Sequence, residues 1–178
     1  MSWSLDKQHL EVGFAAKHMM VATVKGRFTE VDAEVHLDEQ RPEASFVRAN
    51  IAAASLTTGA ADRDAHLKSA DFFDIERYPA LTFVSREVRR KGDDLELLGD
   101  LKIKDVTRPI TLKGEYTGPI QGPWGGRHVG FSLAGELDRE EFGLTWNVAL
   151  EAGGVLVGKK VKLTIDAEVK EDAASAAA

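Results

Sequence analysis

Residues 63–85 read RDAHLKSADFFDIERYPALTFVS and contain the change of pattern on which the fold prediction rests. The segment begins as a short helix, passes through the adjacent side chains of Phe72 and Phe73, and breaks at Pro79. After Pro79 it continues as a strand, and the chain on both sides of the segment has the pattern of β-strands. Such a helix either closes one end of a barrel with core phenylalanines or gates an apolar cavity. If it is a gate, at least one of the two phenylalanines faces the lumen.

Apolar and polar residues alternate with a period of two in most of the remaining chain, which is typical of half-buried strands. We expect one long strand over Val21–Leu37, with a β-bulge near Arg27–Glu30 to correct the register. Turn residues recur at regular spacing between the alternating runs. This spacing predicts an all-β fold, an elongated antiparallel up-and-down barrel of the lipocalin type. It would have about eight strands and a short helix at one end.

Composition limits the classes of function. The 178 residues suit a single domain, which we place at residues 1–170, followed by a disordered tail over residues 171–178. A net charge of −6 argues against a nucleic-acid partner, and the lack of cysteine excludes disulfides and thiolate chemistry. No signal-peptide pattern and no apolar run long enough to span a membrane are present, so we expect a cytoplasmic protein.

No catalytic or metal-binding motif stands out. The sequence has no HExxH or HxH arrangement, no GxSxG elbow and no glycine-rich phosphate loop, so we expect no catalytic residues, no metal and no cofactor. A metal site joining His9 and His18 across strands is a minor alternative. A second alternative is an enzyme for a small hydrophobic substrate, with His18 or His66 as the acid–base. A third is a dimeric stress or interaction protein whose core is filled.

The inward faces of the predicted strands carry many small side chains, which either bring the walls close together or leave a void. They are Ala33, Ala49, Ala53, Gly99, Gly114 and Ala167. A void with such a lining would be dry and would suit a hydrocarbon. Composition alone is equally consistent with a packed core and with a cavity.

Several motifs occur in an order that resembles YceI-like proteins. They are WxLDxxHxxVxFxxKH at residues 3–18, VKGRF at 24–28, RDxHLxSxDFFD at 63–74, YPxLTFxS at 78–85, GDLxI at 99–103, VTRPI at 106–110 and RxxFG at 139–143. The resemblance extends from residue 3 to about residue 170. It departs from the family at Leu10, where a serine is common, and at Asp105, where a glycine is common. We expect neither of these two side chains to touch a cavity.

The resemblance implies an extended lipocalin-like barrel that holds a long polyisoprenoid or isoprenoid-quinone-like chain in a tunnel. Several members form homodimers, and the family offers no agreed catalytic site. We therefore predict a protein that sequesters or carries a long-chain isoprenoid and is not an enzyme. The residues expected to form the wall and the mouth are Phe14, Met20, Phe28, Phe72, Phe73, Phe83, Leu97, Phe131 and Phe142. His18, Arg63 and Arg139 are the expected partners of a polar head group, with surface salt bridging as the alternative.

Overall fold

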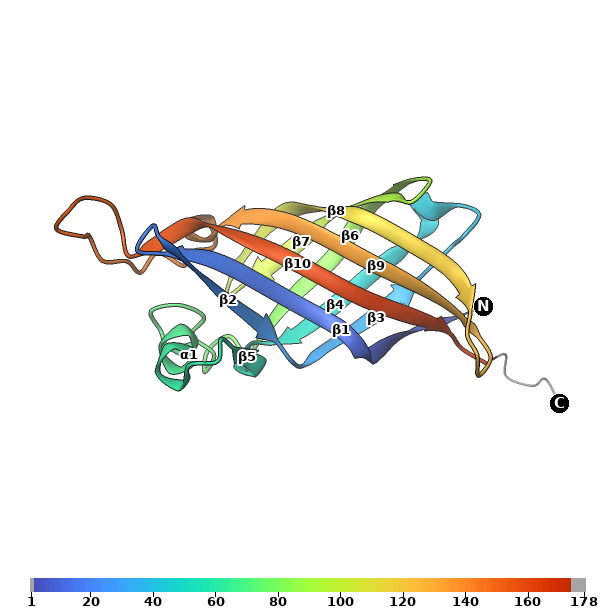
Figure 1. Ribbon diagram of the computed structural model, residues 1–178, viewed down its shortest axis with the longest axis horizontal. Coiled ribbons are helices and arrows are strands. Elements are labelled where there is room, and N and C mark those ends of the chain that lie inside the picture. The colour runs from blue at the N-terminus through green and yellow to red at the C-terminus, as the bar shows by residue number, and fades with distance from the viewer. Residues whose placement is uncertain (1, 174–178) are drawn as a thin grey trace.

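The computed structural model describes residues 2–173 and forms one antiparallel sheet of ten strands that curls into an elongated barrel (Figure 1). The strands are β1 (Trp3–His18), β2 (Ala22–Phe28), β3 (Val31–His36), β4 (Phe46–Ala52), β5 (Leu56–Thr57), β6 (Ala80–Lys91), β7 (Asp94–Ile103), β8 (Val106–Gln121), β9 (Arg127–Asp138) and β10 (Val157–Glu171). Their order across the sheet is β3-β4-β6-β7-β8-β9-β10-β1-β2-β5. The predicted all-β, lipocalin-like architecture is confirmed, with ten strands in place of about eight.

The two ends of the barrel are built differently. Helix α1 (Ala61–Lys68) lies beside β5 at one end, and the first and last described residues of the chain lie at the other end (Figure 1). Three short 3-10 turns complete the fold, namely η1 (Pro42–Ala44), η2 (Ala53–Ser55) and η3 (Arg139–Phe142). Within the part of the chain that the structure describes, no helix is both long and apolar enough to cross a membrane.

The expected single strand over Val21–Leu37 is wrong. The chain divides after Phe28, so that β2 pairs with β1 and β5, whereas β3 pairs with β4 at the opposite edge of the sheet. The irregular position of Phe28 in the alternating pattern therefore marks a break between two strands rather than a bulge. Within β3 the alternation is as expected, because Val31 is buried and Asp32 is exposed.

The barrel closes along a seam between β1 and β3, which lie next to each other. No ladder of backbone hydrogen bonds joins these two strands in the described chain. An ion pair between Lys7 and Asp32 crosses the seam instead. On the other side of β1, the ladder with β10 has an irregularity between Leu5 and Leu10, where β1 contains extra residues. Between Leu5 and Leu10, β1 therefore lacks a regular ladder to either β10 or β3.

The C-terminal part of the chain is held against the N-terminus. Strand β10 continues to Glu171, and the Asp172 amide donates a hydrogen bond to the Ser2 carbonyl at 2.9 Å. The remaining positions of the expected tail, residues 174–178, lie outside the described residues.

The buried apolar side chains form two clusters, one toward each end of the barrel. The cluster at the α1 end includes Phe72, Phe142 and Leu144. The cluster at the end of the chain termini includes Trp3 and Tyr116.

Strand β9 packs closely against Gly114 of β8. A Cβ atom on Gly114 would lie 1.8 Å from the backbone oxygen of Ser132, so no larger residue fits without movement of the main chain. We expect Gly114→Ala to lower the free energy of unfolding by about 1–3 kcal/mol because of overpacking, as measured by urea denaturation. The matched control is Gly130→Ala, because a Cβ atom on Gly130 would meet its nearest neighbour at 3.9 Å. Equal stabilities of the two variants would contradict this account of the β8–β9 contact.

Candidate ligand-binding cavity

The barrel encloses an apolar cavity of about 300 Å³. Its lining begins with Phe72, Phe73 and Leu144 near α1 and continues to Leu37 and Pro42 near the chain termini. The lining residues come from both core clusters, so the cavity is elongated along the barrel. Its volume is at the lower end of the roughly 300–1,000 Å³ that is usual for small-molecule sites. The barrel is therefore a container rather than a completely packed core.

A row of aromatic rings runs from the wall to the segment after α1. Phe14 and Phe28 have ring centroids 5.6 Å apart, and Phe28 and Phe73 meet edge to face at 5.9 Å. Gly26 makes room for the first ring, because a Cβ atom there would lie 2.2 Å from Cζ of Phe14. Packing between neighbouring strands and the α1 segment therefore sets the position of Phe73.

Phe72 and Phe73 both line the cavity, so the expectation that at least one of them faces the lumen is confirmed. The turn after α1 holds them, since the Phe72 amide donates to the Ser69 carbonyl and the Phe73 amide donates to the Leu67 carbonyl, both at 3.0 Å. Phe72 is only 5% exposed and packs against Trp146, with ring centroids 5.5 Å apart. The two phenylalanines therefore form the end wall of the lumen.

The other predicted site residues divide into two groups. Phe14, Phe28, Phe83, Leu97, Phe131 and Arg139 also line the cavity, and His18, Met20, Arg63 and Phe142 are not among its lining residues. Met20 is 66% exposed in a turn, and Phe142 is buried in the core outside the lumen. Arg63 donates hydrogen bonds to the Thr58 hydroxyl and carbonyl at the start of α1.

Several lining residues were not predicted. Leu10 lines the cavity, contrary to the expectation that it would not touch one. Tyr116 and Arg90 also line it, at the end away from α1. Tyr116 could have been found from the sequence, since it is four residues from the inward-facing Leu112 on the same strand. Arg90 carried no such signal, because a charged residue on a strand is usually directed to solvent.

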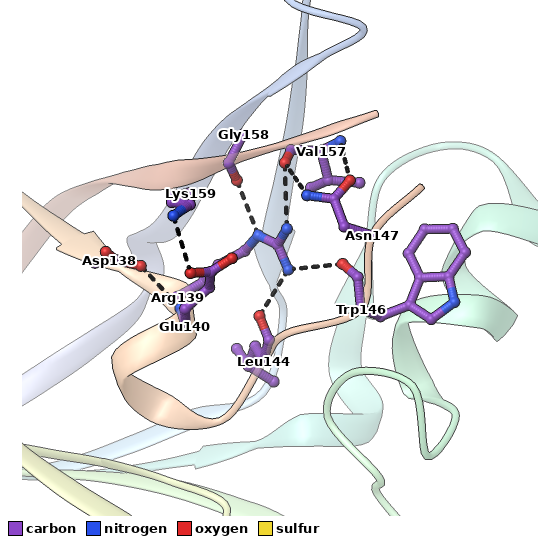
Figure 2. A network of polar contacts seen from close by, with 9 residues as sticks. All are labelled: Asp138, Arg139, Glu140, Leu144, Trp146, Asn147, Val157, Gly158 and Lys159. Carbon is purple, nitrogen blue, oxygen red and sulfur yellow. Dashed lines mark hydrogen bonds and ion pairs between the residues drawn. The ribbon is translucent and has the colours of Figure 1, made fainter. Parts of the chain in front are cut away.

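Arg139 has a structural role that its charge does not suggest (Figure 2). Its side chain is 3% exposed and donates to four backbone carbonyls, namely those of Gly158 at 2.8 Å, Leu144 at 2.6 Å, Trp146 at 3.0 Å and Val157 at 3.2 Å. Burial lowers the pKa of Arg139. The dipoles of the four carbonyl groups stabilise the positive charge of the guanidinium. Each guanidinium nitrogen already has an acceptor in the chain, and the expected surface salt bridge does not form because the side chain is buried. Arg139 therefore fastens the segment after η3 to β10.

We expect Arg139→Lys to lower the free energy of unfolding by about 3 kcal/mol, because a single ammonium group cannot reach four carbonyls that are spread around a planar guanidinium. Chemical denaturation measures the change. Arg77→Lys is the control, since the Arg77 side chain is 73% exposed, and its effect should stay within about 0.5 kcal/mol. A difference of less than about 1 kcal/mol between the two variants would show that the Arg139 network contributes little.

One group of histidine and carboxylate side chains in the described chain could hold a cation. Asp6, His9 and Glu168 place their ligand atoms within 4.8 Å of one another, beside the irregularity in β1. The His9 Nδ1 atom lies 3.0 Å from Asp6, and Glu168 also contacts the His128 Nδ1 atom at 2.6 Å. The predicted alternative of a site shared by His9 and His18 is not found, because His18 is not in this group. The group is a surface network whose members already bind one another.

The Asp6–His9–Glu168 network changes the pKa of His9, which can be measured. The hydrogen bond that His9 donates to the Asp6 carboxylate, aided by the charges of Asp6 and Glu168, raises the pKa of His9 above its ordinary value. The stabilisation from this pairing is thus fully present below the pKa of the unfolded state and is lost as the pH rises through the folded pKa. We expect Asp6→Asn to lower the midpoint of the His9 titration followed by NMR, and Asp62→Asn, on the exposed side of α1, to leave it unchanged. An unaltered His9 midpoint in Asp6→Asn would contradict the assignment.

Comparison with known proteins agrees with the fold and the motifs. A family model described as a YceI-like domain matches residues 3–169. The chain belongs to the YceI-like family. It is 38% identical to the protein YceI of Escherichia coli O17:K52:H18 over 144 residues, which are 80% of this chain and 75% of that protein.

Two solved structures share the fold of this YceI-like protein. BcnA of Burkholderia cenocepacia superimposes with a TM-score of 0.79 and 21% identity, over 93% of this chain and 99% of BcnA. A polyisoprenoid binding domain from Saccharophagus degradans superimposes with a TM-score of 0.70 and 12% identity, over 97% of this chain and 99% of that domain. At sequence identities of 21% and 12%, these two structural similarities establish the fold alone.

Proposed function

We propose that this YceI-like protein binds a long-chain isoprenoid inside its barrel and so sequesters or carries it. The observation that carries the proposal is the elongated apolar cavity, which extends between the two differently built ends of the barrel. The polyisoprenoid binding domain of Saccharophagus degradans, which has the same fold, supports this choice of ligand. Because burial of each CH₂ group contributes about 0.8 kcal/mol, an apolar chain in this cavity needs few polar contacts to bind.

The small residues on the lumen face favour a branched chain. Ala33 and Ala49 face each other on β3 and β4, and Ala167 lies opposite Phe131 on β10 and β9. All of these side chains line the cavity. Small side chains beside aromatic ones leave recesses along the wall, which would accept the methyl branches of an isoprenoid.

The histidines give little support to the alternative of an enzyme. His66 pairs with Asp71 at 2.9 Å, but this pair is partly exposed on the α1 segment and does not line the cavity. His36, the histidine among the described lining residues, stacks on Phe46 with ring centroids 5.3 Å apart. No histidine–carboxylate pair among the described lining residues is therefore in place to exchange protons with a molecule in the lumen.

Filling the cavity tests the proposal. We expect purified wild-type protein to carry an apolar ligand that native mass spectrometry detects and organic extraction removes. Ala49→Trp should abolish this uptake, because the indole occupies the lumen. Ala134→Trp is the matched control, since Ala134 is exposed on β9 and its substitution should leave uptake unchanged.

The fold of each variant is checked by circular dichroism, and Ala167→Phe provides a second, smaller obstruction in case Ala49→Trp does not fold. A wild-type protein that is empty as isolated, and that takes up no polyprenol in a competition assay, would overturn the proposal. Equal uptake by both lumen variants and by the control would do the same.

A further inference from the structure

Tyr116 presents a buried hydroxyl group without a partner. It lines the cavity at the end away from α1, it is 1% exposed, and its hydroxyl oxygen has no hydrogen-bond partner among residues 2–173. Burying a hydroxyl without a hydrogen bond costs free energy, and a phenylalanine would fill the same space without that cost. Burial also raises the pKa of Tyr116, so the group stays protonated and can donate. A hydrogen-bond acceptor on a bound ligand would explain why this position is a tyrosine rather than a phenylalanine.

Arg90 lies against the same ring. Its Cζ atom is 3.6 Å from the centroid of the Tyr116 ring, and it lines the cavity as well. Its Nε atom donates to the Gly92 carbonyl at 2.9 Å, and its guanidinium lies close enough to the Tyr116 hydroxyl to oppose the rise in the pKa of that tyrosine. Arg90 forms no ion pair with any carboxylate in the described chain. Two hydrogen-bond donors of the lumen wall therefore lie side by side.

Asp38 and Ser45, two other polar residues at this end, already have hydrogen-bond partners in the chain. The Asp38 carboxylate accepts from the amides of Gln40 at 3.0 Å and Arg41 at 2.8 Å, and it pairs with the Arg41 side chain. The Ser45 hydroxyl accepts from the Asp38 amide at 2.9 Å.

The neighbouring arginines Arg41 and Arg127 form ion pairs with carboxylates. Arg127 pairs with Glu39 and with Glu171, both at 2.9 Å. Asp38, which lines the same end as Arg90, would repel an added anion. A neutral group that accepts hydrogen bonds fits this arrangement of charges better than a group with a full charge.

The geometry points to a head-group subsite, and we propose that Tyr116 and Arg90 bind a neutral oxygen acceptor, a carbonyl group, at one terminus of the isoprenoid. This inference rests on the proposed function and adds the orientation of the ligand in the cavity. At the opposite end, four of the five N–H groups of the Arg139 guanidinium already donate to backbone carbonyls. The head group therefore lies at Tyr116, and the hydrocarbon tail ends at Phe72 and Phe73.

A pair of probes separates the head group from the chain. Farnesylacetone is an isoprenoid chain with a terminal ketone, and farnesane is an isoprenoid hydrocarbon without a head group. Both are titrated against a fluorescent apolar reporter bound to wild-type protein, Tyr116→Phe, Arg90→Met and Tyr78→Phe. Tyr78→Phe is the matched control, because Tyr78 is the other tyrosine of the chain and does not line the cavity.

We expect Tyr116→Phe to weaken farnesylacetone binding about five- to tenfold, the effect of one lost hydrogen bond, and to change farnesane binding less than about twofold. Arg90→Met should act in the same direction, and Tyr78→Phe should change neither probe. The melting temperature of Tyr116→Phe should equal or exceed that of the wild type, because an unpaired buried hydroxyl is removed.

Two results would overturn the inference, and they are distinguishable. If wild-type protein binds both probes but Tyr116→Phe weakens them equally, or weakens neither, the subsite is refuted and the binding function stands. If wild-type protein binds neither probe, the proposed function itself fails. If Tyr116→Phe weakens the binding of farnesylacetone but not that of farnesane, both the subsite and the proposed function are supported.

Discussion

This structure depends on the main-chain hydrogen bonds between its strands. They form a wall around an interior that the side chains do not completely fill. Each strand is hydrogen-bonded to its neighbours from β3 at one edge of the sheet to β5 at the other, with local irregularities in three of the ladders. Three of its strands, β1, β8 and β10, have 15 or 16 residues, well above the usual five or six. Bonds between such long strands support the wall from within the sheet. The lumen can therefore stay open along much of its length without a packed core to support it.

The two ends of the lumen make different contacts possible. At the α1 end, aromatic rings close the space and the Arg139 side chain donates to four backbone carbonyls. At the other end, Tyr116 and Arg90 bring hydrogen-bond donors to the lumen wall. An apolar wall between one polar and one apolar end matches a molecule with a head and a tail. In the proposed binding mode, the phenylalanines after α1 contact the end of the tail and the head group lies at the other end.

Sequence reasoning succeeded where the information is local. Alternation identified the inward face of β3, and the break at Pro79 separated the α1 segment from β6. It failed over Val21–Leu37, because alternation shows which side chains share a face but not which strands are neighbours. The change from β2 to β3 moves the chain from one edge region of the sheet to the other within two residues. Arg139 was misjudged for a related reason, since the carbonyls that surround it belong to residues up to 19 positions away.

The sequence by itself determined the all-β class, the helix near one end, the family and most of the aromatic lining, because these depend on period-two patterning and on motifs read in order. Only the tertiary structure decided that Leu10, Tyr116 and Arg90 line the lumen and that His18, Met20, Arg63 and Phe142 do not. The physical reason is that the direction of a side chain depends on bulges, on strand order and on the docking of turns. Each of these is set by contacts between residues far apart in the chain.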